Sequence, residues 1–424
     1  MDDQPELARQ IGTTDAVVIG LGSMIGAGVF SAFGPAARAA GAGLLIGLAL
    51  AAAIAYCNAT ASAQLAAVYP TSGGTYIYGR ERLGPWWGFV AGWGFVIGKS
   101  ASCAAMALTV AAYAVPGPWW AQRVIAVTAV IVLIALNYRG ITKTAMLARI
   151  LLACALIALA AVVIGIAVAR PEPHLIHWSA GTVYGVLQSA GLLFFAFAGY
   201  ARIATMGEEV RDPARTIPKA ITVALAIAVT IYLVVGVAAL LAAGPDRLAH
   251  AAAPLDEAVR AAGAAALVPV VTVGAALASL GALLALIAGL GRTVLAMARH
   301  RDLPAWLAAV HPRHRVPHHA EIALGVVVCV LVATVDLRGV IGFSSFGVLI
   351  YYAIANAAAY TLPTPDNKRR RRALNVSGLA GCLLLVATLP WESVIAGLGV
   401  FAVGIAGRLV LRRSAVSSTV PPRG

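Results

Sequence analysis

Long stretches without charge alternate with short polar segments along the whole chain. A helix needs about 20 apolar residues to cross the roughly 30 Å of hydrocarbon in a bilayer. Several uncharged stretches reach that length by themselves, which predicts an all-α polytopic membrane protein. The nine longest stretches without Asp, Glu, Lys or Arg are 16–37, 39–79, 100–122, 150–169, 173–201, 220–245, 261–291, 339–365 and 373–391.

This pattern predicts 12 transmembrane helices joined by short loops, so the function is expected to lie within the spans. The spans lie near 15–36, 42–66, 86–114, 122–137, 145–169, 181–207, 218–243, 264–298, 319–335, 339–362, 374–390 and 392–411. The chain divides into a cytoplasmic N-terminus at 1–14, spans 1–5 at 15–170, spans 6–10 at 181–362, spans 11 and 12 at 374–411 and a cytoplasmic tail at 412–424.

Basic residues gather in alternate loops, and this asymmetry predicts the orientation. With the N-terminus inside, the inner loops hold most Lys and Arg residues, among them the run KRRRR at 368–372. An excess of positive charge inside is the usual bias of membrane proteins. Both termini are therefore expected in the cytoplasm, and the chain is expected to be a multi-pass protein of the cell membrane.

The composition is that of a protein surrounded by lipid. Of the 424 residues 61% are hydrophobic and 11% are charged, against about 25% charged in a soluble domain. The inner loops account for the net charge of +14, so no nucleic-acid partner is expected. No cofactor or metal is expected either, because arginines and prolines interrupt the histidines of HPRHRVPHH at 311–319.

The stretch GLGSMIGAGVF at 20–30 holds four glycines and allows several interpretations. A dinucleotide-binding turn has the spacing GxGxxG and an acidic residue about 20 positions later. Here the spacing is GxGxxxG and the first carboxylate after Asp15 is Glu81, which argues against a nucleotide site. Gly22 and Gly26 suit a helix-packing face, and the same glycines suit a helix that is broken within the membrane.

A broken helix is the functional interpretation. Each glycine costs a helix about 1 kcal/mol, and unwound backbone in a bilayer is tolerated only where it lines a polar cavity. The N–H groups that begin the next half-helix then point at an anion such as a carboxylate. A matching break is predicted in span 6, at Gly191 and Gly199. This spacing predicts two inverted five-helix repeats of the LeuT type, with helices 1 and 6 discontinuous and two further C-terminal helices.

Four segments resemble one family of transporters. They are GSMIGAGVF at 22–30, QLAAVYPTSGGTYIYGRERLG at 64–84, FFAFAGYARIATMGEEVRDPARTIPKAI at 194–221 and RTVLAMARHRDLPAWLAAVHPRHRVPHHA at 292–320. On these segments the chain is identified as a member of the amino acid–polyamine–organocation (APC) superfamily. It is similar to the bacterial amino acid permeases near the cationic amino acid transporter branch. The resemblance implies a twelve-span inverted-repeat fold that works by alternating access.

The resemblance also implies a substrate site at the two breaks. The substrate carboxylate would meet the backbone N–H groups of residues 25–28, and its amine the carbonyls beside Met24 and around Phe195 and Ala198. Phe195 lies where relatives often carry an aromatic gate, and Leu283 where some relatives with basic substrates carry tryptophan. The candidate binding residues are Ser23, Met24, Ile25, Gly26, Ala27, Gly28, Phe195, Phe197, Ala198, Gly199 and Leu283.

One lysine lies in the middle of a predicted span. Proton-coupled relatives commonly carry a lysine in span 5, at a position that is about Ala155 here, whereas Lys99 lies deep in span 3. A charge at that depth is costly and is by default functional, so Lys99 is the candidate coupling residue. The alternative is a structural lysine that backbone carbonyls hold at a helix break. Closer to the cytoplasm, Arg202 is expected to extend to the membrane surface or to pair with Glu208 or Glu209, and the alternative is contact with the substrate.

Together these features predict a secondary transporter and not an enzyme, because no paired catalytic groups lie within the spans. The residues near the first break are mainly small and apolar, and no carboxylate lies deep in a span, which suits a neutral amino acid. We expect proton-coupled transport. The alternative is an exchanger of amino acids against amines or polyamines, and a channel or membrane-embedded enzyme fits less well. The outer segment APLDEAVRAAG at 253–263 predicts a short amphipathic helix.

Overall fold

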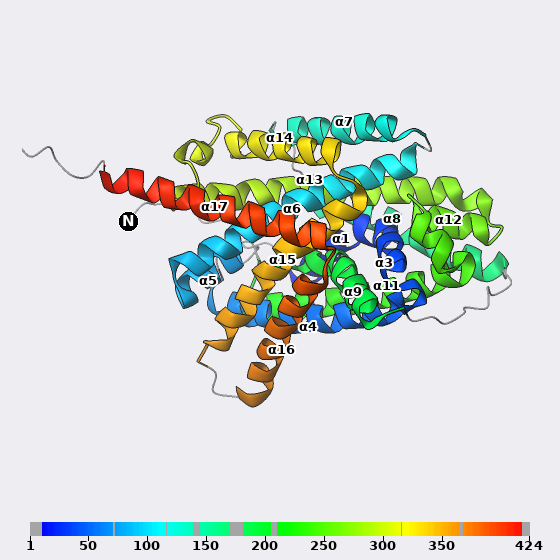
Figure 1. The fold of residues 1–424 in the computed structure, drawn as a ribbon, viewed down its shortest axis with the longest axis horizontal. Helices are drawn as coiled ribbons and strands as arrows, with labels where there is room; N and C mark the ends of the chain where they lie inside the picture. The colour runs from blue at the N-terminus through cyan, green and yellow to red at the C-terminus, as the bar shows by residue number, and fades with distance from the viewer. Residues whose placement is uncertain are drawn as a thin grey trace, which may run out of the picture.

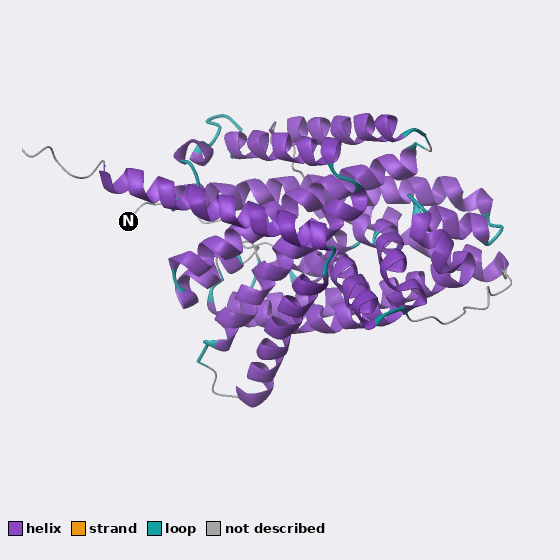
Figure 2. Cartoon of the chain, viewed as in Figure 1, coloured by secondary structure: helices purple, strands orange, loops and turns teal. Residues whose placement is uncertain are grey.

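The computed structural model describes residues 11–70, 73–115, 117–138, 145–169, 181–204, 210–314, 316–363 and 368–417 (Figure 1). Within these ranges the regular structure is helical (Figure 2), apart from an isolated bridge between Ile11 and Val210. The predicted N-terminus at 1–14 and tail at 412–424 are described only from Ile11 and as far as Ser417, respectively.

Eight α-helices form the first part of the described chain. They are α1 (Thr13–Met24), α2 (Ala27–Ser31), α3 (Phe33–Ala40), α4 (Leu44–Val68), α5 (Thr75–Leu83), α6 (Pro85–Ala114), α7 (Trp119–Tyr138) and α8 (Ala145–Ala169). A short 3₁₀ turn over Gly41–Gly43 joins α3 to α4.

The second part of the described chain begins at residue 181. It contains α9 (Val183–Phe197), α10 (Ala201–Ala204), α11 (Pro213–His250), α12 (Pro254–Ala261), α13 (Val268–Arg299), α14 (His318–Thr334), α15 (Leu337–Tyr360), α16 (Lys368–Thr388) and α17 (Trp391–Ser417). The short helix predicted at 253–263 is confirmed as α12, which buries Leu255 and Val259 on its apolar side.

The membrane character predicted from the charge-free stretches is confirmed. Among the described residues, ten helical segments are long and apolar enough to cross a membrane. The predicted spans at 319–335 and 374–390 correspond to α14, which is only 17 residues long, and α16, which begins with the basic run at 368–372. The count of 12 spans and the inverted repeats therefore remain predictions.

Helices at the centre of the bundle are distinguished from those at its edge by their burial. The apolar windows of α6 and α15 are 89% and 83% buried, whereas those of α7 and α17 are 17% and 22% buried. In Figure 1, α7 lies beside α14 along the upper edge, and α17 crosses the outside of α6. Large apolar side chains on α7 and α17 are exposed, as expected of helices that face lipid.

The two ends of the bundle are distinguished by where the first helix, α1, begins. We call the end where α1 begins the N side and the opposite end the far side. At the N side, Ile11 pairs with Val210 just before α11, and Tyr76 of α5 bonds to Asp302 just after α13. At the far side, Arg38 near the end of α3 donates to the carbonyl of Ala249 near the end of α11.

Candidate functional site

A break is present in each of the two predicted helices, and the two breaks lie against each other. In span 6 the break is at Gly199, whereas the prediction of a break at Gly191 is wrong because α9 continues through that residue. α1 ends at Met24, Ile25 and Gly26 leave helical geometry, and α2 begins at Ala27. In the other break, α9 ends at Phe197 and a 3₁₀ turn over Ala198–Tyr200 leads into α10. A 3₁₀ turn inside a helix often marks a functional hinge or local strain.

Glycine is required where the two breaks touch. A Cβ atom on Gly199 would lie 2.2 Å from the carbonyl oxygen of Ser23, and one on Gly28 would lie 2.6 Å from the Cα of Ala196. Both contacts are with backbone, which cannot rotate away. Two of the glycines that suggested broken helices, Gly28 and Gly199, therefore also lie where the two backbones approach closely.

Tyr232 of α11 links the two breaks, although no sequence pattern distinguished it. Its Oη lies 2.7 Å from the carbonyl oxygen of Met24 and 2.9 Å from that of Ala196. The hydroxyl has one hydrogen and can donate to only one of them at a time. The side chain is buried, and its ring packs on Phe197 with a centroid distance of 5.0 Å. Phe197 thus contacts α11.

The four backbone N–H groups expected to bind a carboxylate are not equivalent. Ile25 donates to Leu21 at 2.7 Å, and Gly26 donates to Met24 at 2.9 Å. Ala27 and Gly28 are the first two residues of α2, where backbone N–H groups have no acceptor in the preceding turn of their own helix. Ala27 and Gly28 are therefore the better placed donors for an anion.

Lys99 reaches the second break from α6. Its Nζ donates to the carbonyl oxygen of Ala198 at 3.0 Å, and Oη of Tyr352 lies 3.4 Å from the same oxygen. The lysine is only 5% exposed. This contact matches the structural alternative for Lys99, in which backbone carbonyls at a helix break hold the lysine. A role of Lys99 in proton coupling stays a prediction. The carbonyl expected to receive the substrate amine already accepts from Lys99.

A cavity of about 110 Å³ lies beside the breaks. Four of the predicted residues line it, namely Ser23, Lys99, Ala198 and Gly199. The other lining residues come from α6, α10, α13 and the segment before α5: Gly73, Phe95, Met106, Ala201, Arg202, Ala282, Ala285, Leu286, Gly289, Arg292, Thr293 and Ala296.

The remaining candidates do not line this cavity. They are buried in the packing around it: Met24, Ile25, Gly26, Ala27, Gly28, Phe195, Phe197 and Leu283. Leu283 is adjacent in sequence to Ala282, which does line the cavity, but is itself fully buried. The cavity therefore lies between the breaks and α13, and substrate binding by these residues stays a prediction.

One face of α13 supplies much of the wall and was missed in the sequence. Ala282, Ala285, Gly289 and Ala296 are small residues at intervals of three, four and seven. Residues at such intervals lie on one face of a helix. Small residues on a single face in a long apolar helix are a signal that could have identified this wall.

The cavity is positively charged among its described lining residues. Lys99, Arg202 and Arg292 line it, and no described lining residue is Asp or Glu. Arg202 and Arg292 each make a further interaction. The predicted partners of Arg202, Glu208 and Glu209, lie outside the described residues.

Contacts on the far side join the segment after the first break to α6 and α12. Tyr113 of α6 donates to the carbonyl of Phe30 at 2.6 Å and accepts from the N–H of Leu255 in α12 at 3.2 Å. On the other side, the lining extends to Gly73 and to Ala296, one turn before α13 ends. The cavity therefore extends toward the N side.

Interrupted apolar helices around a charged internal cavity define a multi-pass membrane transporter. Comparison with known families makes the assignment specific, because the amino acid permease family model matches residues 15–404. The chain belongs to the amino acid permease family. The family assignment made from the four sequence segments is confirmed, and the protein is a transporter and not an enzyme.

Relatives extend over almost the whole chain. An uncharacterized transporter of Mycobacterium tuberculosis (strain ATCC 25618 / H37Rv) is 59% identical over 421 residues, covering 97% of this chain and 94% of the relative. The branched-chain amino acid permease BcaP of Bacillus subtilis (strain 168) is 26% identical, covering 92% and 90%. Cationic amino acid transporter 4 of Homo sapiens is 28% identical, covering 85% of this chain and 60% of the relative.

Proposed function

We propose that this permease carries a neutral amino acid across the cell membrane by alternating access, with its N side in the cytoplasm. The observation that carries the proposal is the lining of the cavity, where the buried Lys99 occurs among small and apolar residues. The names of the relatives include both a branched-chain amino acid permease and cationic amino acid transporters. The names alone therefore do not decide between a neutral and a cationic substrate, whereas the cavity lining favours the neutral one.

Electrostatics favour the neutral substrate. Two like charges 4 Å apart repel by about 4 kcal/mol at an effective dielectric constant of about 20. A lysine or arginine substrate would bring a further positive charge close to Lys99, which lines the cavity and is only 5% exposed. A neutral amino acid instead offers a carboxylate to the basic residues of the lining and an apolar side chain to the α13 wall.

Uptake into proteoliposomes tests this choice. We expect radiolabelled leucine to enter more than about tenfold faster than lysine at equal concentration, since about 1.4 kcal/mol corresponds to a factor of ten. Empty liposomes give the background. Lysine uptake equal to or faster than leucine uptake would exclude the neutral-substrate proposal.

We further propose that Lys99 couples transport to protons. Its ammonium group is buried, lines the cavity and bonds to the second break at Ala198. Release of a proton would remove the positive charge and weaken this bond, which would let the break move when substrate binds. This step supports symport of substrate and proton.

A second function is supported by the same contact. If the bond from Lys99 to Ala198 keeps the lysine permanently charged, Lys99 is a fixed structural cation and the protein is an amino acid/amine or polyamine exchanger. Counterflow distinguishes the two functions. Uptake that requires internal amine supports exchange, and uptake that a protonophore abolishes without any internal substrate supports symport.

The finer architecture is part of the proposal. Two breaks five predicted spans apart support inverted repeats at 15–170 and 181–362, with 374–411 outside them. The basic run at 368–372 supports cytoplasmic termini. Epitope tags before residue 14 and after residue 412 should both be labelled only in permeabilised cells if this orientation is right.

A further inference from the structure

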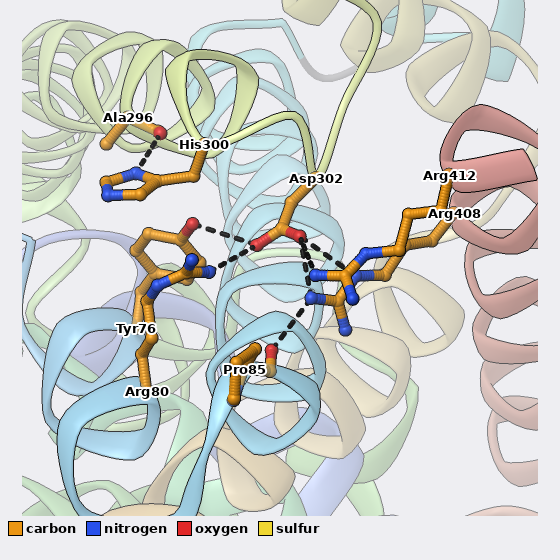
Figure 3. Close-up of polar contacts among 8 residues, drawn as sticks. All are labelled: Tyr76, Arg80, Pro85, Ala296, His300, Asp302, Arg408 and Arg412. Atoms are coloured by element: carbon orange, nitrogen blue, oxygen red, sulfur yellow. Dashed lines mark hydrogen bonds and ion pairs between the residues drawn. The ribbon is translucent and has the colours of Figure 1, made fainter. Parts of the chain in front are cut away.

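A buried carboxylate joins three elements at the N side of the bundle. Asp302, just after α13, is fully buried at its side chain. Its Oδ2 accepts from Oη of Tyr76 at 2.9 Å and lies 3.4 Å from Nη1 of Arg80, both on α5. Its Oδ1 lies 2.7 Å from Nη2 of Arg408 and 3.6 Å from Nη2 of Arg412, both on α17. Figure 3 shows Asp302 between the two pairs.

This cluster, Tyr76, Arg80, Asp302, Arg408 and Arg412, has an excess of positive charge. Three guanidinium groups surround one carboxylate, and among the described residues no other carboxylate forms an ion pair with them. Tyr76 adds no cation. Burial and the charge of Asp302 raise the pKa of its phenol, so that it remains a hydrogen-bond donor. Two positive charges are thus left without a counter-charge in the described part of the chain.

Arg408 shows that this excess is partly buried. Its side chain is fully buried, with the guanidinium 4.3 Å from the ring centre of Trp86 and 4.6 Å from that of Phe89. Nη2 also donates to the carbonyl of Pro85 at 2.9 Å, whereas Nη1 is buried without a partner among the described residues. A buried charged group that lacks part of its hydrogen bonding is costly, and a nearby anion would offset that cost.

The open side of the cluster faces a lipid-exposed surface. Arg412 and Arg80 have side-chain exposures of 43% and 24%. Arg412 follows Leu409 and Val410, which are 42% and 63% exposed on α17. Trp86 is also exposed at the start of α6, and aromatic residues of this kind concentrate at the headgroup level of membranes. The apolar surroundings favour a lipid headgroup over an ion from bulk water.

We propose that Arg80 and Arg412 bind the phosphate of an anionic phospholipid in the N-side leaflet. Both are partly exposed and carry guanidinium N–H groups that suit phosphate oxygens, while buried Arg408 contributes positive charge from beneath. A bound phosphate would balance the excess charge around Asp302 and hold α17 against α5. Since Gly73, two residues before α5, lines the transport cavity, lipid at this site would also steady the N-side wall of that cavity.

Native mass spectrometry of the purified full chain tests the site, with phosphatidylglycerol or phosphatidylcholine added to the detergent. The wild type should retain phosphatidylglycerol in preference to phosphatidylcholine. Arg412→Gln should weaken phosphatidylglycerol binding about fivefold, because one basic residue near an anionic surface is worth about 1 kcal/mol. Arg413→Gln is the matched control, since Arg413 is the next residue, is exposed and is outside the cluster; it should bind like the wild type.

Two results would overturn the proposal. One is equal loss of phosphatidylglycerol in both variants, which would indicate unspecific attraction to basic residues. The other is displacement of the lipid by inorganic phosphate at comparable concentration, which would indicate a site for a soluble anion. Thermal unfolding in detergent without anionic lipid checks the fold. In that detergent Arg412→Gln should have the same unfolding temperature as the wild type. A lower unfolding temperature would instead assign Arg412 a structural role.

Discussion

Lys99 donates from Nζ to the carbonyl oxygen of Ala198 at 3.0 Å, and so joins the middle of α6 to the point where α9 ends. The same carbonyl belongs to the interrupted helix that packs against Ser23 through Gly199. The amine of Lys99 therefore bonds to the residue next to Gly199, where the two breaks pack together. Substitutions of Lys99 and of Gly199 can test the two contacts separately.

Removal of the Lys99 amine should abolish proton coupling. In Lys99→Ala, uptake into proteoliposomes with an acidic exterior should fall to the rate measured without a pH gradient, because no titratable group at this position remains. Lys219→Ala is the control, since Lys219 is exposed on α11. If Lys99→Ala kept gradient-driven uptake at the wild-type rate, Lys99 would not be the coupling residue.

Gly199→Ala should disrupt contact between the breaks. Its methyl group would overlap the backbone of Ser23, and overpacking of this kind typically costs about 1–3 kcal/mol. We expect a lower unfolding temperature and no stabilisation by leucine. Gly22→Ala is the matched control, because a Cβ there meets nothing within 4 Å. Equal behaviour of the two variants would contradict the close approach.

Tyr232→Phe should weaken substrate binding while the fold persists. The ring keeps its packing on Phe197, but the carbonyl of Ala196 loses its side-chain donor, whereas that of Met24 keeps the N–H of Gly26. A buried polar group left unpaired costs about 1–3 kcal/mol, so we expect KM to rise roughly tenfold at a similar maximal rate. Tyr184→Phe, at an exposed tyrosine of α9, is the control. An unchanged KM would show that the link between the breaks does not affect the substrate site.

Asp302→Asn should destabilise the protein far more than loss of an exposed carboxylate. Removing one partner of a buried ion pair costs about 3–5 kcal/mol, and here three arginines lose their counter-charge. Asp212→Asn is the control, because the pair of Asp212 with Arg215 is exposed and 3.9 Å long, and such pairs contribute about 0–1 kcal/mol. Thermal unfolding measures both, and equal shifts would refute a central role for Asp302.

The sequence predicted the broken helices because glycine acts locally. The four glycines at 20–30 lower the helix propensity of span 1 whatever its tertiary contacts are. The break between Met24 and Ala27 falls within that stretch. Lys99 was likewise recognisable, because a lysine in the middle of a charge-free span is unusual in any fold. Its acceptor was not, since Ala198 is an apolar residue that contributes only a backbone carbonyl.

Other parts of the site gave no comparable signal. Tyr232 is one tyrosine in a long apolar helix, and nothing in its neighbourhood predicts that its hydroxyl reaches both Met24 and Ala196. Arg408 looks like any basic residue near the end of a span, here the predicted span at 392–411. The structure buries it between Trp86 and Phe89 and pairs it with an aspartate more than a hundred positions away.

The sequence by itself determined the class of this protein, its family and the approximate places of its spans and breaks. These follow from the length of charge-free stretches, which the thickness of a bilayer sets, and from motifs that are contiguous in the chain. The tertiary structure decided which groups meet: Lys99 with Ala198, Tyr232 with two carbonyls, and Asp302 with α5 and α17. Such contacts depend on how whole helices pack, and the 226 positions that separate Tyr76 from Asp302 carry no local pattern that would predict them.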